Sequence, residues 1–226
     1  MRTIAIKVAA VALAGALGFS GPFGAAAATE GAENDKPGVQ FTWALLQRVP
    51  EGDYVRTKLV EDGAKLASGA GLRLVVERLT PCTVYVIHRG PRGEITRLFP
   101  PAGFDRDQGV AQRVSVPSDD DWLWLDDGTG TERFVVIAAT EPIVRLDALL
   151  GLYETADAGA RAALGDDLER EIVRLRREHQ PLSKDAERPA IVGGAVRGFE
   201  SWGKKPEAVT VATDGVFVKV LTIDHH

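Results

Sequence analysis

The sequence predicts a mainly β protein, a single antiparallel β-sandwich-like domain with one inserted amphipathic helix. Short strand patterns separated by turns follow one another from Leu72 to Ile143. After Pro142 the hydrophobic period changes from that of a strand to that of a helix, and strand patterns return between Ile191 and Ile223. Because the last strand patterns are too few to bury a core alone, we expect them to join the same domain, residues 39–226.

The first 28 residues have the pattern of a secretory signal peptide. Arg2 and Lys7 form a positive region, Val8–Leu17 an apolar core, and Ala25–Ala28 a run of small residues. The strongly apolar part is about half of the roughly 20 residues that a membrane span requires. We therefore expect cleavage near Ala28, no membrane insertion afterwards, and a periplasmic or secreted protein.

Charge and cysteine content narrow the classes of partner. The chain has 27 Lys and Arg against 32 Asp and Glu, and loss of residues 1–28 takes its net charge from −5 to −7. An acidic protein is not expected to bind nucleic acid. The one cysteine, Cys82, lies in a Val/Tyr/Ile-rich strand pattern, which predicts a buried thiol and no intramolecular disulfide.

The N-terminal part of the predicted domain is only partly assigned. Residues 29–38 lack large apolar side chains and are predicted to be a flexible leader. Val39–Val49 fits neither the strand nor the helix period, so both assignments stay open. A turn at Pro50–Gly52 then leads to a strand pattern at Tyr54–Glu61.

The central block is predicted to be an antiparallel meander. Leu72–Leu79 alternates apolar and polar residues as a half-buried strand does. The loop 126–131 is rich in Asp and Gly, which predicts a hairpin between the strand patterns on its two sides. The remaining predicted strands of the block are Cys82–Arg89, Glu94–Phe99, Arg113–Val116, Trp122–Leu125 and Glu132–Ala139.

Residues 146–180 are predicted to be a helical excursion. Leu146–Tyr153 fits one or two helical turns, and Ala160–His179 a longer helix that Pro181 ends. The charged run Glu169–Glu178 is expected to face solvent. One apolar stripe is expected to dock this helix on the sheet; its members are Leu164, Leu168, Ile172 and Leu175.

No sequence pattern predicts a catalytic, cofactor or metal site, and we expect no enzyme. Cys82 and His88 lie six residues apart on one predicted strand, about 20 Å in extended chain, too far to act as a pair. Ser68 and Ser201 lack the glycines of a nucleophile elbow. The glycines of 193–198 do not match a phosphate loop. The four histidines have no metal-ligand spacing beyond an adjacent terminal pair; they are His88, His179, His225 and His226. The acidic residues of the 119–132 region lack the spacing of a calcium loop; they are Asp119, Asp120, Asp121, Asp126, Asp127 and Glu132.

Trp122 and Trp124 are two residues apart, so both belong to one face of a strand while Leu123 and Leu125 belong to the other. Exposed tryptophans in this arrangement would form a platform for a sugar or a protein. Packing of the tryptophans in the core is the preferred expectation.

The central block resembles a family of bacterial domains catalogued as domain of unknown function 4384. The resemblance covers residues 71–143, and LFP at Leu98–Pro100 and GTE at Gly130–Glu132 are its most specific parts. The matching segments are GLRLVVE at Gly71–Glu77, VYVIHRGPRGEITRLFP at Val84–Pro100, VP at Val116–Pro117 and WLWLDDGTGTERFVVIAATEPI at Trp122–Ile143.

The resemblance implies a β-sandwich outside the cytoplasm, of a kind often attached to signalling kinases or caspase-like peptidases, with no established activity. The family pattern often has Asn after LFP, whereas this chain has Pro101, so no ligand role is carried over. We expect an exported, non-enzymatic binding or adaptor module for an envelope protein. The alternatives are a structural protein of the envelope and, less favoured, a small metal-dependent hydrolase.

Overall fold

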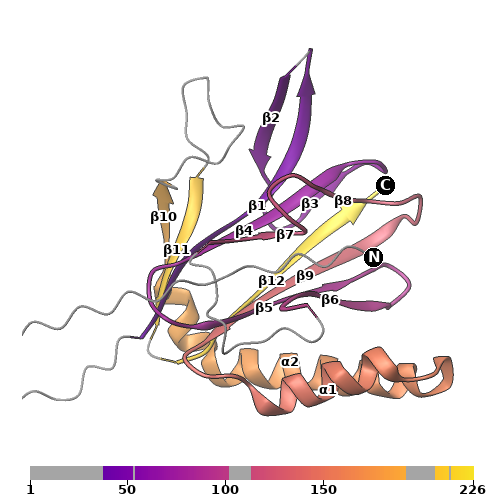
Figure 1. Ribbon diagram of the computed structural model, residues 1–226, viewed down its shortest axis with the longest axis vertical. Coiled ribbons are helices and arrows are strands. Elements are labelled where there is room, and N and C mark those ends of the chain that lie inside the picture. Colours follow the sequence, from indigo (N-terminus) through magenta and orange to yellow (C-terminus); the bar gives the residue numbers. More distant parts are fainter. Residues whose placement is uncertain (1–37, 53, 102–112, 192–206, 214) are drawn as a thin grey trace, which may run out of the picture. The chain divides into compact units, whose positions relative to one another are not determined.

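The computed structural model describes residues 38–226 apart from 53, 102–112, 192–206 and 214, and describes no side chains at 180–208 (Figure 1). Every described element belongs to one compact unit within residues 35–226. The predicted signal peptide and nearly all of the predicted leader lie outside the described residues.

The described elements form two sheets and two helices, which confirms the mainly β prediction. Sheet A has seven strands and is antiparallel throughout. In spatial order it contains β10 (Glu187–Ile191), β11 (Glu207–Thr213), β1 (Val39–Glu51), β4 (Gly71–Arg78) and β7 (Arg113–Val116), with β2 (Tyr54–Leu59) paired to β1 and β8 (Leu123–Trp124) paired to β4.

Sheet B has five strands and is mixed, because β3 runs parallel to β12 while the other pairs are antiparallel. In spatial order it contains β3 (Ala64–Leu66), β12 (Phe217–His225), β9 (Gly130–Ala139), β5 (Thr83–Arg89) and β6 (Ile95–Phe99). The segment Val39–Val49, for which strand and helix were both left open, is part of strand β1 in sheet A.

The main core lies between the two sheets. Alternate residues of β1 and β4, such as Phe41 and Leu74, are fully buried against alternate residues of β9 and β12, such as Val136 and Phe217. The rings of Phe41 and Phe217 meet edge to face with centroids 5.3 Å apart, so the sheets are in direct contact. This arrangement is the predicted sandwich.

The helices α1 (Val144–Thr155) and α2 (Ala158–Ala186) pack on the other face of sheet B (Figure 1). Leu168, Ile172 and Leu175 of the predicted stripe are buried there, which confirms the docked helix. The expected end at Pro181 was wrong, because α2 continues to Ala186. A proline in a helix removes one backbone donor, and in a helix of 29 residues this local loss is small beside the remaining backbone bonds and the packed stripe.

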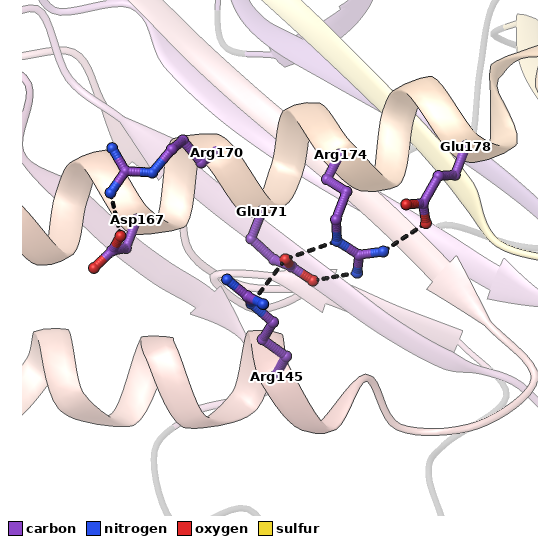
Figure 2. Close-up of polar contacts among 6 residues, drawn as sticks. All are labelled: Arg145, Asp167, Arg170, Glu171, Arg174 and Glu178. Atoms are coloured by element: carbon purple, nitrogen blue, oxygen red, sulfur yellow. Dashed lines mark hydrogen bonds and ion pairs between the residues drawn. The ribbon is translucent and has the colours of Figure 1, made fainter.

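The expectation that the whole charged run Glu169–Glu178 of α2 faces solvent was wrong for Glu171. The Glu171 side chain is completely buried where α2 meets α1, and Figure 2 shows it between two arginines. Arg174 donates to it over 3.0 and 2.5 Å, and Arg145 of α1 lies 3.1 Å away. The hydrogen bond from Arg174 lowers the pKa of Glu171. Burial is tolerated because the charge is paired.

The predicted meander was wrong in two places. β4 belongs to sheet A and β5 to sheet B, so the chain crosses between sheets at Thr80–Pro81. The loop 126–131 likewise joins β8 of sheet A to β9 of sheet B and does not close a hairpin. Alternation in a sequence reports which residues share a face and carries no information about which strand lies beside which.

Candidate functional site

Two arrangements of polar side chains stand out among the described residues. The first joins four side chains from separate parts of the sequence. Ser68 Oγ lies 3.0 Å from His225 Nε2, and His225 Nδ1 lies 3.2 Å from Glu132 Oε1. The other carboxylate oxygen of Glu132 lies 2.6 Å from His88 Nε2. Glu132 and His225 are 3% and 1% exposed, so the centre of this polar chain is buried.

Sheet B brings these residues together. On β9, Gly130 pairs with His225 of β12, and Phe134 pairs with His88 of β5. Glu132 lies two residues from each of them along β9, so its side chain is on the same face as both histidines. All three side chains point toward the inter-sheet core. Ser68 follows β3, which pairs with the end of β12. Sequence spacing missed this group because the residues lie up to 157 positions apart.

The proton positions follow from the partners. An ionised carboxylate only accepts hydrogen bonds, so in that state of Glu132 the ring nitrogens of His88 and His225 that face it donate. In the neutral tautomer of His225 that carries its proton on Nδ1, Nε2 then accepts a hydrogen bond from the Ser68 hydroxyl. Serine, histidine and carboxylate are thus connected as in the triad of a serine hydrolase.

The backbone N–H groups of residues 68–70 are all engaged in hydrogen bonds. A hydrolase directs free N–H groups at the oxyanion that forms on its substrate. Here the N–H of Ser68 donates to His226 O over 3.1 Å, that of Gly69 to Leu125 O over 2.9 Å, and that of Ala70 to Ala67 O over 3.1 Å. The arrangement ties the loop after β3 to the end of β12 and to the loop after β8.

The structure separates the acidic residues of the 119–132 region. Asp119 accepts from Ser115 over 2.5 Å, Asp126 accepts from the Gly128 N–H over 2.7 Å, and Glu132 belongs to the buried polar chain. Within the described part of the chain, no group of three His, Cys, Asp or Glu side chains is placed to hold a metal ion.

Cys82 is 6% exposed, as predicted for a buried thiol, and burial raises its pKa. A buried thiol with a raised pKa is a poor nucleophile. Ser201 and the glycines of 193–198 lie outside the described residues.

The second arrangement is an aromatic surface on sheet A. The expectation that Trp122 and Trp124 pack in the core was wrong, because Trp124 is 55% exposed and Trp122 half-buried. Leu123 and Leu125 take the inward positions and pack in the inter-sheet core. Two apolar pairs compete for one inward face at this place, and the period alone does not decide between them.

The exposed ring of Trp124 packs against Gly71 on the neighbouring strand. Gly71 of β4 pairs directly with Trp124 of β8, and a Cβ at position 71 would lie 3.1 Å from Trp124 Cζ3. Arg48 follows Gln47, the partner of Leu72, so it lies opposite Gly71 on β1. Its guanidinium carbon is 5.7 Å from the centroid of the Trp124 ring.

The next row of the sheet repeats the pairing of arginine with tryptophan. Arg73 lies 4.1 Å from the centroid of the Trp122 ring and donates to Asp121 O over 3.1 and 2.9 Å. Arg73 is 6% exposed, and burial lowers its pKa. We call the surface formed by Arg48, Gly71, Arg73, Trp122 and Trp124 the Trp–Arg face.

Comparison with known proteins leaves the family open. No protein-family model matches the chain, and no curated protein was found to be similar to it. The resemblance of residues 71–143 to the domain of unknown function 4384 therefore stays a prediction. Of the helices that the structure describes, none is both long and apolar enough to cross a membrane.

Proposed function

We propose that this protein is an exported, non-enzymatic binding module that attaches to a component of the cell envelope through the Trp–Arg face. The observation that carries the proposal is the exposed Trp124 ring resting on Gly71. An indole held in this way is already ordered before a ligand arrives, so binding costs little side-chain entropy.

The size of the exposed ring sets the scale of the interaction. A tryptophan side chain presents about 150–250 Å² of surface, and about half of it is open here. At about 25 cal/mol per Å², covering that half contributes roughly 2–3 kcal/mol. This is enough for Trp124 to dominate a weak or moderate binding site.

The non-enzymatic part of the proposal is supported by the surroundings of Ser68. Its hydroxyl is oriented by His225, but the N–H groups of residues 68–70 are engaged with carbonyl oxygens. Stabilisation of the oxyanion commonly lowers the barrier to acyl transfer more than any other single effect. We therefore assign the polar chain a structural role.

The test is co-sedimentation of the purified mature chain with envelope material of the source cells. The wild-type chain is expected to sediment, and Trp124→Ala to lose most of its bound fraction. Tyr54→Ala is the matched control, since Tyr54 is an exposed aromatic residue on the β1–β2 hairpin. Equal sedimentation of wild type and Trp124→Ala would reject the proposal, as would no sedimentation of the wild type.

A further inference from the structure

We propose that the ligand of the Trp–Arg face is an acidic glycan, bound with one sugar ring stacked on Trp124 and a carboxylate on Arg48. This inference rests on the proposed binding function and specifies the chemistry of the ligand. It follows from which groups on this face are open to a ligand and which are already occupied.

Close to the indoles little other apolar surface is open, and Val55, which the register places on the same face further along the β1–β2 hairpin, is 38% exposed. The aliphatic residues beside them on the same face are Ala44, Leu46 and Val75, and these are only 2–4% exposed. A protein partner needs a broad contact of roughly 800 Å² per side with an apolar centre. One exposed ring surrounded by polar groups matches the C–H face of a single pyranose instead.

The polar groups around the ring favour a negatively charged sugar. Among the described residues Arg48 has no hydrogen bond or ion pair, and its guanidinium stacks on Trp124. Arg73 differs, because its guanidinium already donates to Asp121 O. Arg48 is half-buried as a residue, and its guanidinium can donate two parallel hydrogen bonds to a carboxylate.

The geometry of the row places both contacts on one ligand. Arg48, Gly71 and Trp124 occupy neighbouring strands in one register row, with Gly71 between the other two. Gly71 has no side chain, and the Trp124 ring and the Arg48 Cβ fill the space over it, so the two groups adjoin each other and a ligand on the open side of the indole can reach both. A uronic acid combines the required ring face and carboxylate.

The experiment titrates the mature full chain with trigalacturonic acid and follows the tryptophan indole N–H signals by NMR. The matched neutral probe is the trisaccharide with a hydroxymethyl group in place of each carboxylate. We expect the Trp124 signal to shift with a Kd of about 1 mM or tighter for the acidic probe, and at least about fivefold weaker binding of the neutral probe. Arg48→Gln should bring the two affinities within about twofold of each other.

Arg56→Gln is the control for net charge, because Arg56 is exposed and paired with Glu51 near the end of the hairpin. It should retain the preference for the acidic probe. No Trp124 shift up to about 10 mM probe, equal affinity for the two probes, or the same effect from Arg56→Gln would overturn the inference. If Trp124-dependent sedimentation survives such a result, the binding function stands and only the glycan assignment fails. Loss of sedimentation after protease treatment of the envelope material would overturn that assignment and indicate a protein partner.

Discussion

Trp124 and Gly71 face each other across an antiparallel strand pair, and the indole lies where the side chain of any other residue at position 71 would lie. Aromatic rings that cover a glycine on a neighbouring strand are a known device for stabilising sheets. Here the ring stays largely open on its other side. The pair therefore supports the pairing of β4 with β8 and leaves one side of the ring exposed, the surface that we propose binds the ligand.

Gly71→Ala tests this relationship. The new methyl group would lie 3.1 Å from Trp124 Cζ3 and 3.3 Å from Arg48 Cβ, so the ring must move by a few tenths of an ångström. We expect a several-fold loss of envelope binding with a small change in thermal stability, measured by co-sedimentation and circular dichroism. Unchanged binding would show that the position of the ring on the glycine is unimportant.

Glu132→Gln should destabilise the fold. The amide that replaces the carboxylate presents a donor to one of the two ring N–H groups that now face acceptors. A buried donor left unsatisfied costs about 1–3 kcal/mol of unfolding free energy. Urea denaturation measures this loss, and Glu61→Gln at an exposed position is the control. A loss as small as that of the control would mean that the polar chain contributes nothing to stability.

Ser68 is expected not to react as a hydrolase nucleophile. A fluorophosphonate probe should leave the chain unlabelled, because the N–H groups of residues 68–70 are already bonded and the phosphonyl oxygen would find no donors there. Mass spectrometry of the treated protein is the measurement. An adduct on Ser68 that disappears in His225→Gln would contradict the non-enzymatic assignment.

Stability should fall in acid through Glu171. Its pKa is lowered in the folded state, chiefly by the hydrogen bond from Arg174. The ion pair therefore contributes fully above the unfolded value of about 4.3, and this contribution is lost as pH falls through the lowered folded value. Thermal unfolding at neutral and acidic pH should show a smaller acid loss for Glu171→Gln than for wild type. The same acid loss in both would contradict this role.

The sequence predicted the fold class and the positions of most strands, because alternation and turn residues are local signals. The docked face of α2 was readable from Leu168, Ile172 and Leu175 for the same reason. The sequence did not predict β3 or most of β10, and it left β1 open between strand and helix. The crossings of the chain from sheet A to sheet B after β4 and after β8 could not be predicted from the sequence, since strand partners depend on the folding of the whole chain.

The candidate sites show the same limit. The polar chain joins Ser68 to His225 and Glu132 to His88 across three strands and a loop, a grouping that no spacing rule could find. The outward position of Trp124 was one of two options allowed by the period. A sign of it was present in the sequence, because Gly71 directly precedes the strand pattern Leu72–Leu79, and a glycine in a strand often marks a close approach.

The most direct test of the central claim is hydroxyl-radical footprinting of the chain bound to envelope material, with oxidation of each aromatic residue read by mass spectrometry. The account predicts strong protection of Trp124 on binding, while the exposed Tyr54 oxidises as in the free protein. Trp124 oxidised equally in the bound and free chain would contradict the claim that the Trp–Arg face is the binding surface.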